Sequence, residues 1–137
     1  YMLQLMGTEA GRDTFNKDLW IHSLEQRARK NKFTVVADVR FPNECDFIRR
    51  VNGFLVRVVR GPEPVWYDHA LHDNAYQSNE KMGNYYPEIH YSEWAWIGQK
   101  TDYVLTNNGT FDMLEADIKH MLKTFIGTDV MKTKMVA

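Results

Sequence analysis

A carboxylate and a guanidinium follow a short apolar segment in the first third of the chain. Asp38 and Arg40 come directly after Phe33–Ala37, five residues that are apolar or β-branched. A run of this length and composition predicts a central strand that is covered on both faces. Ligands of open α/β sheets bind at the edge where the strands end, so this pair suits a metal or phosphate site. An internal ion pair at a strand end is the alternative explanation.

Further helices and strands are expected on both sides of this segment. Apolar residues at helical spacing predict a helix over 15–30. A second helix is expected from Pro42 to Val51, with Pro42 in its first turn and Asn52-Gly53 at its end. Phe54–Val59 is the next predicted strand. A strand, helix and strand of this total length form a parallel crossover.

The C-terminal third repeats this alternation of strand and helix. Asp102–Thr106 is predicted to be a last buried strand, and 107–110 a turn. In that turn Gly109 permits a positive φ and Thr110 can cap the helix expected over 111–126. The segment 127–137 has no pattern and is predicted to be a frayed tail. The fold class is therefore α/β, with a mainly parallel sheet and flanking helices.

The segment 61–89 shows no periodic pattern. Long segments of this kind are usually functional or disordered, and its five tyrosine and tryptophan residues argue against simple disorder. It contains five acidic residues and one lysine. We expect a lid-like insertion that is the most mobile internal segment of the chain. A zinc site is a further alternative, with ligands drawn from His69, His72, Asp73 and His90.

Composition restricts the class of protein. The 137 residues are 44% hydrophobic and 26% charged, with a net charge of −1, so they indicate one globular domain. No basic stripe indicates a nucleic-acid partner, and no apolar segment is long enough to indicate a membrane span. The single cysteine, Cys45, cannot form an internal disulfide. These observations together predict a cytoplasmic location.

Four short motifs occur in a fixed order along the chain. They are Met2-Leu3-Gln4 with Gly7–Arg12, Asp38–Glu44, His90-Tyr91-Ser92-Glu93, and Asn107-Asn108-Gly109-Thr110. Together they resemble the motifs of the bacteriophage-type deoxynucleoside monophosphate kinases, and phosphomevalonate kinases share a looser version. The order and spacing agree from about Tyr1 to Leu122, which is nearly the whole chain.

This resemblance implies the P-loop kinase fold and the transfer of phosphate from ATP to a (deoxy)nucleoside monophosphate, with Mg²⁺ as cofactor. It implies that Asp38 holds Mg²⁺ or its waters and that Arg40 contacts the transferring or acceptor phosphate. It also implies that Arg12 binds the acceptor side, whereas Arg60 and Glu93 lie at the base of the lid. The residues implied at the nucleotide-base end of the donor site are Asn107 and Gly109.

One element of such kinases is missing from these residues. No G-x-x-x-x-G-K-[ST] phosphate loop occurs, because only three residues separate Gly7 from Gly11 where the motif has four, and Arg12 and Asp13 follow. Because the sequence starts at Tyr1 and inside a helical pattern, we expect 1–126 to be the C-terminal part of a kinase-like domain. A missing N-terminal segment or a protein partner would then complete the incomplete P-loop-kinase-like domain.

Two other functions remain open. The first is a relative without a phosphate loop that binds nucleotides or proteins and does not catalyse phosphate transfer. The second is a metal-dependent nuclease that uses Asp38 and Glu44, although no basic groove is evident from the sequence.

Overall fold

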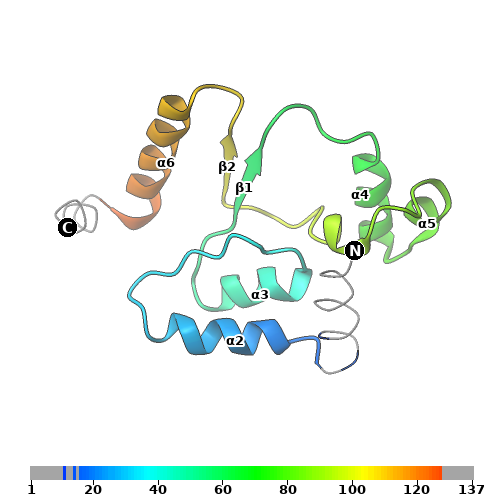
Figure 1. Cartoon of the computed structure of the whole chain (residues 1–137), viewed down its shortest axis with the longest axis horizontal. Coiled ribbons are helices and arrows are strands. Elements are labelled where there is room, and N and C mark those ends of the chain that lie inside the picture. The colour runs from blue at the N-terminus through cyan, green and yellow to red at the C-terminus, as the bar shows by residue number, and fades with distance from the viewer. Residues whose placement is uncertain (1–10, 12–13, 15, 128–137) are drawn as a thin grey trace. The chain divides into compact units, whose positions relative to one another are not determined.

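The computed structural model describes residues 11, 14 and 16–127, which form two compact units (Figure 1). The first unit comprises the described residues up to Val51 together with Pro64–Gln99. The second comprises Asn52–Glu63 and the described residues from Lys100 onward. Helices and a small parallel sheet are both present, which confirms the α/β class. No helix in the described part of the chain combines the length and apolar character needed to cross a bilayer.

The sheet of the second unit consists of two parallel strands. Strand β1 (Val56–Val59) pairs with β2 (Tyr103–Thr106), and Val56 lies opposite Tyr103. The Asp102 carboxylate extends this pairing by accepting a hydrogen bond from the Leu55 N–H at 2.8 Å. The strands predicted over 54–59 and 102–106 are therefore confirmed, and their parallel pairing agrees with the expected mainly parallel sheet. The predicted parallel crossover from 33–37 to 54–59 is wrong, because 33–37 is not a strand.

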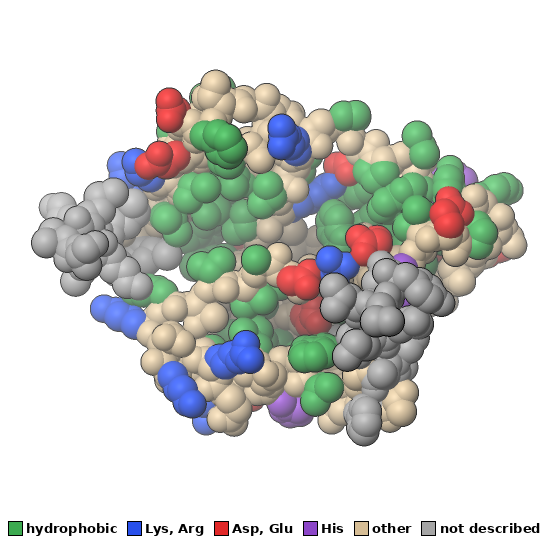
Figure 2. All heavy atoms as spheres, viewed as in Figure 1, with side chains coloured by type: hydrophobic (Ala, Val, Ile, Leu, Met, Phe, Trp, Pro, Cys, Tyr) green, Lys and Arg blue, Asp and Glu red, His purple; other side chains and the backbone are tan. Residues whose placement is uncertain are grey.

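The sheet is less buried than a parallel sheet normally is. Leu105 is buried, whereas the side chains of Val58 and Val104 are 60% and 53% exposed. Figure 2 shows hydrophobic side chains at the surface in the area of the sheet and the last helix. The prediction that 102–106 is a buried strand is therefore wrong for most of its residues, because within the second unit the sheet has only two described strands to share a core.

Helix α6 (Phe111–Ile126) completes the second unit as predicted. The Thr110 hydroxyl accepts a hydrogen bond from the Met113 N–H at 3.3 Å and so caps the helix. Tyr103 donates a hydrogen bond to Asp117 at 2.6 Å, which joins α6 to β2. The expected positive φ at Gly109 is wrong. An added Cβ would lie 2.8 Å from the Met113 sulfur, so a larger residue at this position would require the exposed Met113 side chain to move.

Two helices lie between residues 16 and 51 of the first unit. Helix α2 (Leu19–Ala28) and helix α3 (Pro42–Arg50) confirm the helices predicted over 15–30 and 42–51. Ile21 of α2 and Phe47 of α3 are buried. Asn52, after α3, adopts the left-handed conformation with a φ of 57°.

The segment between these helices is not the strand that the sequence predicts. Phe33–Ala37 has no regular secondary structure, and Val35 is 94% exposed. Apolar β-branched residues favour a strand only where a neighbouring strand and a covering layer are present. No described strand pairs with 33–37, so the prediction of a central buried strand is wrong here.

The segment 61–89 is folded. It contains α4 (Tyr67–Tyr76) and α5 (Glu80–Tyr85), and a single 3₁₀ turn, η2 (Tyr91–Glu93), follows them. These elements share a core of Ala70, Met82, Trp94 and Ile97, with side chains exposed by 3% or less. The lack of a periodic sequence pattern therefore does not reflect a lack of helices, and the expected role as a mobile, lid-like insertion stays a prediction. Both helices are short, and their buried positions are too few to produce a periodic pattern.

Candidate functional site

Arg40 lies between two carboxylates that come from distant parts of the sequence. Its Nε donates a hydrogen bond to Asp38 Oδ1 at 2.5 Å, and its Nη1 donates one to Glu93 Oε1 at 2.8 Å. The hydrogen bond to Asp38 and the charges of both carboxylates raise the pKa of Arg40, although partial burial opposes them. The guanidinium is therefore permanently charged and is held in one orientation.

One end of this guanidinium remains accessible. The Arg40 side chain is 40% exposed, and its Nη2 has no partner among the described residues. The Asp38 and Glu93 side chains are 76% and 44% exposed. A planar donor group that is oriented on two sides and open on the third is suited to an oxyanion such as phosphate.

The start of α3 fixes the backbone of this arginine. Glu44 Oε2 accepts hydrogen bonds from the N–H groups of Arg40 and Phe41, at 2.8 and 3.1 Å. Phe41 is extended, with φ −124° and ψ 150°, and Pro42 occupies the first turn of the helix. The Glu44 carboxylate therefore serves as the cap of α3, which explains its place in the motif Asp38–Glu44.

The second half of the site is built by η2. His90 Nδ1 lies 3.2 Å from the Ser92 N–H and 2.8 Å from the buried Ser92 hydroxyl, which fixes the turn. Glu93 at its end reaches Arg40. Tyr91 contacts the Phe41 ring at a centroid distance of 6.0 Å. The motif His90-Tyr91-Ser92-Glu93 therefore contacts the motif Asp38–Glu44 and supplies the second carboxylate bonded to Arg40.

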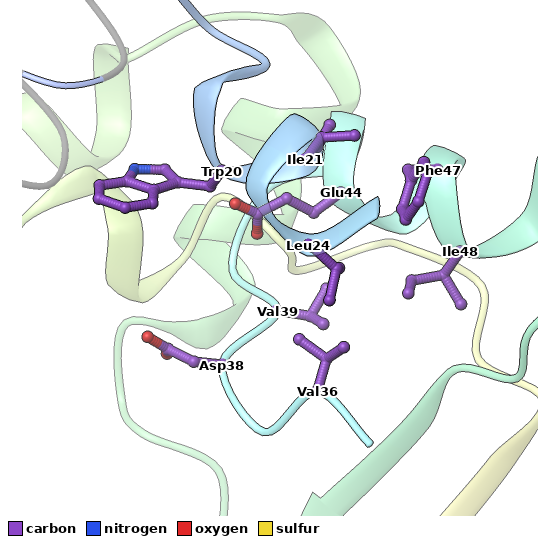
Figure 3. Close-up of a pocket in the computed structure, with 9 residues that line it drawn as sticks. All are labelled: Trp20, Ile21, Leu24, Val36, Asp38, Val39, Glu44, Phe47 and Ile48. Atoms are coloured by element: carbon purple, nitrogen blue, oxygen red, sulfur yellow. The ribbon is translucent and has the colours of Figure 1, made fainter. Parts of the chain in front are cut away.

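A small apolar pocket adjoins this cluster (Figure 3). Leu24 and Ile48 belong to its apolar side, whereas the Asp38 and Glu44 carboxylates point toward the side of Trp20. Its volume is about 100 Å³, far below the several hundred Å³ of pockets that enclose organic ligands. We therefore regard it as a packing gap between α2 and α3 and not as a nucleotide site.

The remaining predicted residues lie elsewhere or outside the described part. Arg12 lies outside the described residues. Arg60, Asn107 and Gly109 belong to the second unit. Arg60 is exposed after β1, and the Asn107 N–H donates to the Val59 carbonyl at 2.8 Å. Their functional roles remain predictions, whereas Asp38, Arg40 and Glu93 are brought together.

The zinc alternative receives no support from the arrangement of its four candidate ligands. His72 Nδ1 lies 3.3 Å from Asp73, but His69 packs edge-on against Tyr85 and Tyr86. Within residues 11, 14 and 16–127, no three His, Cys, Asp or Glu side chains gather as a metal-binding group. The nuclease alternative receives no support either, since the Glu44 carboxylate that it would use accepts the backbone hydrogen bonds at the start of α3.

Sequence reasoning missed the role of Asp73. Its side chain is fully buried, and its carboxylate accepts hydrogen bonds from the Met82 N–H at 2.8 Å and the Ser78 hydroxyl at 2.9 Å. The Lys81 N–H and His72 Nδ1 lie at 3.3 Å. Asp73 thus joins the end of α4 to the start of α5. The signal for this role is an acidic residue at a buried position of a helix. The buried positions of α4 are known only from the structure, so the sequence alone does not single out Asp73.

Comparison with known proteins yields one significant relationship. Over 53 residues the chain is 45% identical to deoxynucleoside-5'-monophosphate kinase of Escherichia phage T5. The matched segment covers 37% of this chain and 21% of the phage protein. No protein-family profile matches the chain, and no solved structure shows a significant match. A local sequence similarity to a nucleotide kinase is therefore established.

Proposed function

We propose that the chain binds a nucleoside monophosphate as the acceptor side of a kinase-like phosphotransferase that uses ATP and Mg²⁺. Arg40 carries this proposal, because its guanidinium is oriented by Asp38 and Glu93 and keeps an accessible Nη2. In this proposal the phosphate of the acceptor receives hydrogen bonds from that end of Arg40. The similarity to the phage T5 kinase supports the same substrate class.

Magnesium has a physical role at such a site. The Asp38 and Glu93 carboxylates are both bonded to the Arg40 guanidinium. A phosphate dianion bound to the same guanidinium would lie near these two carboxylates, and a cation bound with it would reduce their repulsion. Asp38 is suited to bind such a cation, because its side chain is exposed and only one of its two carboxylate oxygens, Oδ1, is bonded to Arg40. Mg²⁺ is commonly bound by one or two carboxylates together with substrate phosphates, and there it neutralises the phosphate charge.

Five further residues complete the proposal. Arg12 and Arg60 are proposed to contact substrate phosphates. Glu93 is proposed to orient Arg40 and not to bind the nucleotide directly, because its carboxylate is bonded to the guanidinium. Asn107 and Gly109, in the turn after β2, are proposed to lie at the base end of the donor nucleotide.

Replacing Arg40 by alanine tests the proposal. We expect Arg40→Ala to weaken monophosphate binding by about 1–3 kcal/mol, because a charged hydrogen bond to phosphate is lost. The thermal unfolding transition should be retained, because Arg40 is partly exposed and the Glu44 cap is made to backbone N–H groups. Calorimetric titration with each deoxynucleoside monophosphate, in the presence and absence of Mg²⁺, measures the effect.

Arg29→Ala is the matched control. Arg29 is also an exposed arginine of the first unit with a carboxylate partner, Glu25, at 2.7 Å. Its removal changes the net charge equally and should leave the affinity unchanged. Equal affinities of wild type and Arg40→Ala, or loss of cooperative unfolding in that variant, would assign Arg40 a purely structural role.

A further inference from the structure

A second and larger hollow lies in the first unit. Its volume is about 650 Å³, within the range of pockets that hold small organic ligands. It is lined by the turn between α4 and α5 and by the segment from Tyr91 to Gln99. Four side-chain amides and two aromatic rings account for much of its lining: Asn74, Gln77, Asn79, Gln99, Tyr91 and Trp94.

The lining favours a neutral polar ligand. Asp73 is the one carboxylate among the lining side chains, and it is fully buried and bonded to the start of α5. No lysine or arginine lines the hollow. The ligand would therefore meet hydrogen-bonding amides and aromatic surfaces and no unpaired charge.

Two of the amides are held in a fixed orientation. Asn74 Nδ2 donates to the carbonyls of Trp94 and Ile97, both at 2.9 Å, which leaves Asn74 Oδ1 as a free acceptor. Gln99 Oε1 accepts from Arg49 Nη1 at 3.1 Å, which leaves the Gln99 amino group as a free donor. Asn74 and Gln99 both line the hollow, so the unused Asn74 oxygen and the unused Gln99 amino group are candidate contacts for a ligand.

Gln77 has an unusual backbone conformation. It ends α4 with a φ of 52° and a ψ of 41°, where glycine is the favoured residue. The Ser78 N–H donates to the Asp73 carbonyl at 2.8 Å, which completes the left-handed turn. The Gln77 side chain has no hydrogen-bond partner among the described residues. Gln77 is exposed, so its side chain is accessible to a ligand in the hollow, and uncommon backbone conformations of this kind are often found at functional positions.

The hollow adjoins the Arg40 site. Pro42 belongs to its lining and lies two residues after Arg40, and Tyr91 lies two residues before Glu93. The same two segments therefore build a wall of the hollow and hold the guanidinium. A ligand with an anionic group at Arg40 and a neutral planar group in the hollow would use both.

We propose that this hollow binds the base of the acceptor nucleotide and that Gln77 reads the hydrogen-bonding edge of that base. Nucleobases are planar and neutral near pH 7, and proteins recognise them with asparagine and glutamine amides and with aromatic rings. This inference rests on the proposed function, because it places the phosphate of the same nucleotide at Arg40.

The substitution Gln77→Gly tests recognition of the base without destabilising the fold. Glycine suits the left-handed conformation, so the melting temperature should stay the same or rise. We expect the dissociation constant of the best-bound nucleoside to increase about 5- to 30-fold, as for the loss of one or two hydrogen bonds. Discrimination among the four bases should fall, whereas binding of inorganic phosphate should not change.

Asn52→Gly is the matched control, because Asn52 is the other described non-glycine residue with a positive φ and lies outside the hollow. Its affinities should equal those of wild type. The titrations use nucleosides, the corresponding monophosphates and inorganic phosphate, with wild type, Gln77→Gly, Asn52→Gly and Arg40→Ala.

The outcomes distinguish this inference from the proposed function. Monophosphates that bind equally well whatever their base, or an unchanged base preference in Gln77→Gly, would overturn the inference and leave the phosphate site intact. Nucleosides that bind through Gln77 while Arg40→Ala leaves monophosphate affinity unchanged would overturn the phosphate site alone. Absence of any nucleoside or nucleotide binding would overturn both.

Discussion

Replacing Asp73 by alanine is expected to destabilise the α4–α5 region by about 2–4 kcal/mol. The substitution removes the acceptor of hydrogen bonds from Met82, Ser78 and Lys81, and the backbone N–H groups at the start of α5 would be left without a cap. Asp73 is fully buried, so water cannot readily replace the carboxylate. The effect should therefore exceed that of an ordinary surface substitution.

Hydrogen exchange of individual amides measures this effect locally. The Ala70 N–H bonds to the Trp66 carbonyl and the Tyr86 N–H to the Met82 carbonyl, so both report the opening of α4 and α5. Their protection should fall in Asp73→Ala. In the control Asp68→Ala, an exposed acid in the first turn of α4, the loss should stay below about 1 kcal/mol. Unchanged protection in Asp73→Ala would show that the buried carboxylate contributes little to folding.

The same residue makes this region sensitive to acid. Burial alone would raise the pKa of Asp73, but the hydrogen bonds from Met82, Ser78 and Lys81 outweigh burial and lower it. Because the folded-state pKa lies below the unfolded value of about 3.9, the stabilisation is complete at neutral pH. It is lost as the pH falls from about 4 through the lowered folded-state pKa. Protection of the Ala70 amide should fall over that acidic range in wild type and change less in Asp73→Asn.

The helices with strong local signals could be predicted from the sequence. Pro42 in a first turn, Thr110 before an amphipathic run and the bases late in α6 all act within a few residues of one another. Such signals do not depend on the rest of the molecule, so α2, α3 and α6 form as expected. Strands β1 and β2 could also be predicted, because each has a short apolar run and the two runs pair with each other.

Features that depend on tertiary contacts which the sequence does not reveal could not be predicted. Phe33–Ala37 has the composition of a strand, but a strand forms only when another one pairs with it, and none of the described strands does. Helices α4 and α5 are held by a core of four residues and by Asp73, so their stability comes from tertiary contacts and not from periodicity.

The candidate site shows the same division. The sequence places Asp38 and Arg40 two residues apart and the cap residue Glu44 nearby, all within one motif. It gives no physical reason for the bond between Arg40 and Glu93, which are 53 residues apart. The resemblance to a kinase family implies a functional role for Arg40 and for Glu93. Only the structure shows that the Glu93 carboxylate orients the Arg40 guanidinium.

We expect the 137-residue chain by itself not to transfer phosphate from ATP. Kinases with the P-loop fold hold the donor phosphates in the backbone N–H groups and the lysine of a glycine-rich loop, and the printed sequence has no such motif. Arg40 cannot replace that loop, because a single side chain that is shared with two carboxylates contacts a phosphate without enclosing it. Loss of even one preorganised donor costs about 100- to 1,000-fold in rate, so loss of a whole phosphate cradle should abolish measurable turnover.

The assay follows labelled phosphate from ATP to each deoxynucleoside monophosphate, with Mg²⁺ present. Acceptor binding should survive in the same chain, because the Arg40 cluster is complete within it. The companion reaction uses the chain joined to whatever sequence its gene encodes upstream. Turnover by the 137 residues alone would contradict the prediction and require a donor-phosphate site built from other residues. Turnover by the longer protein alone would establish a kinase whose acceptor side lies in these residues. Acceptor binding without turnover in either form would instead establish a nucleotide-binding relative in which Arg40 retains the phosphate and no longer takes part in its transfer.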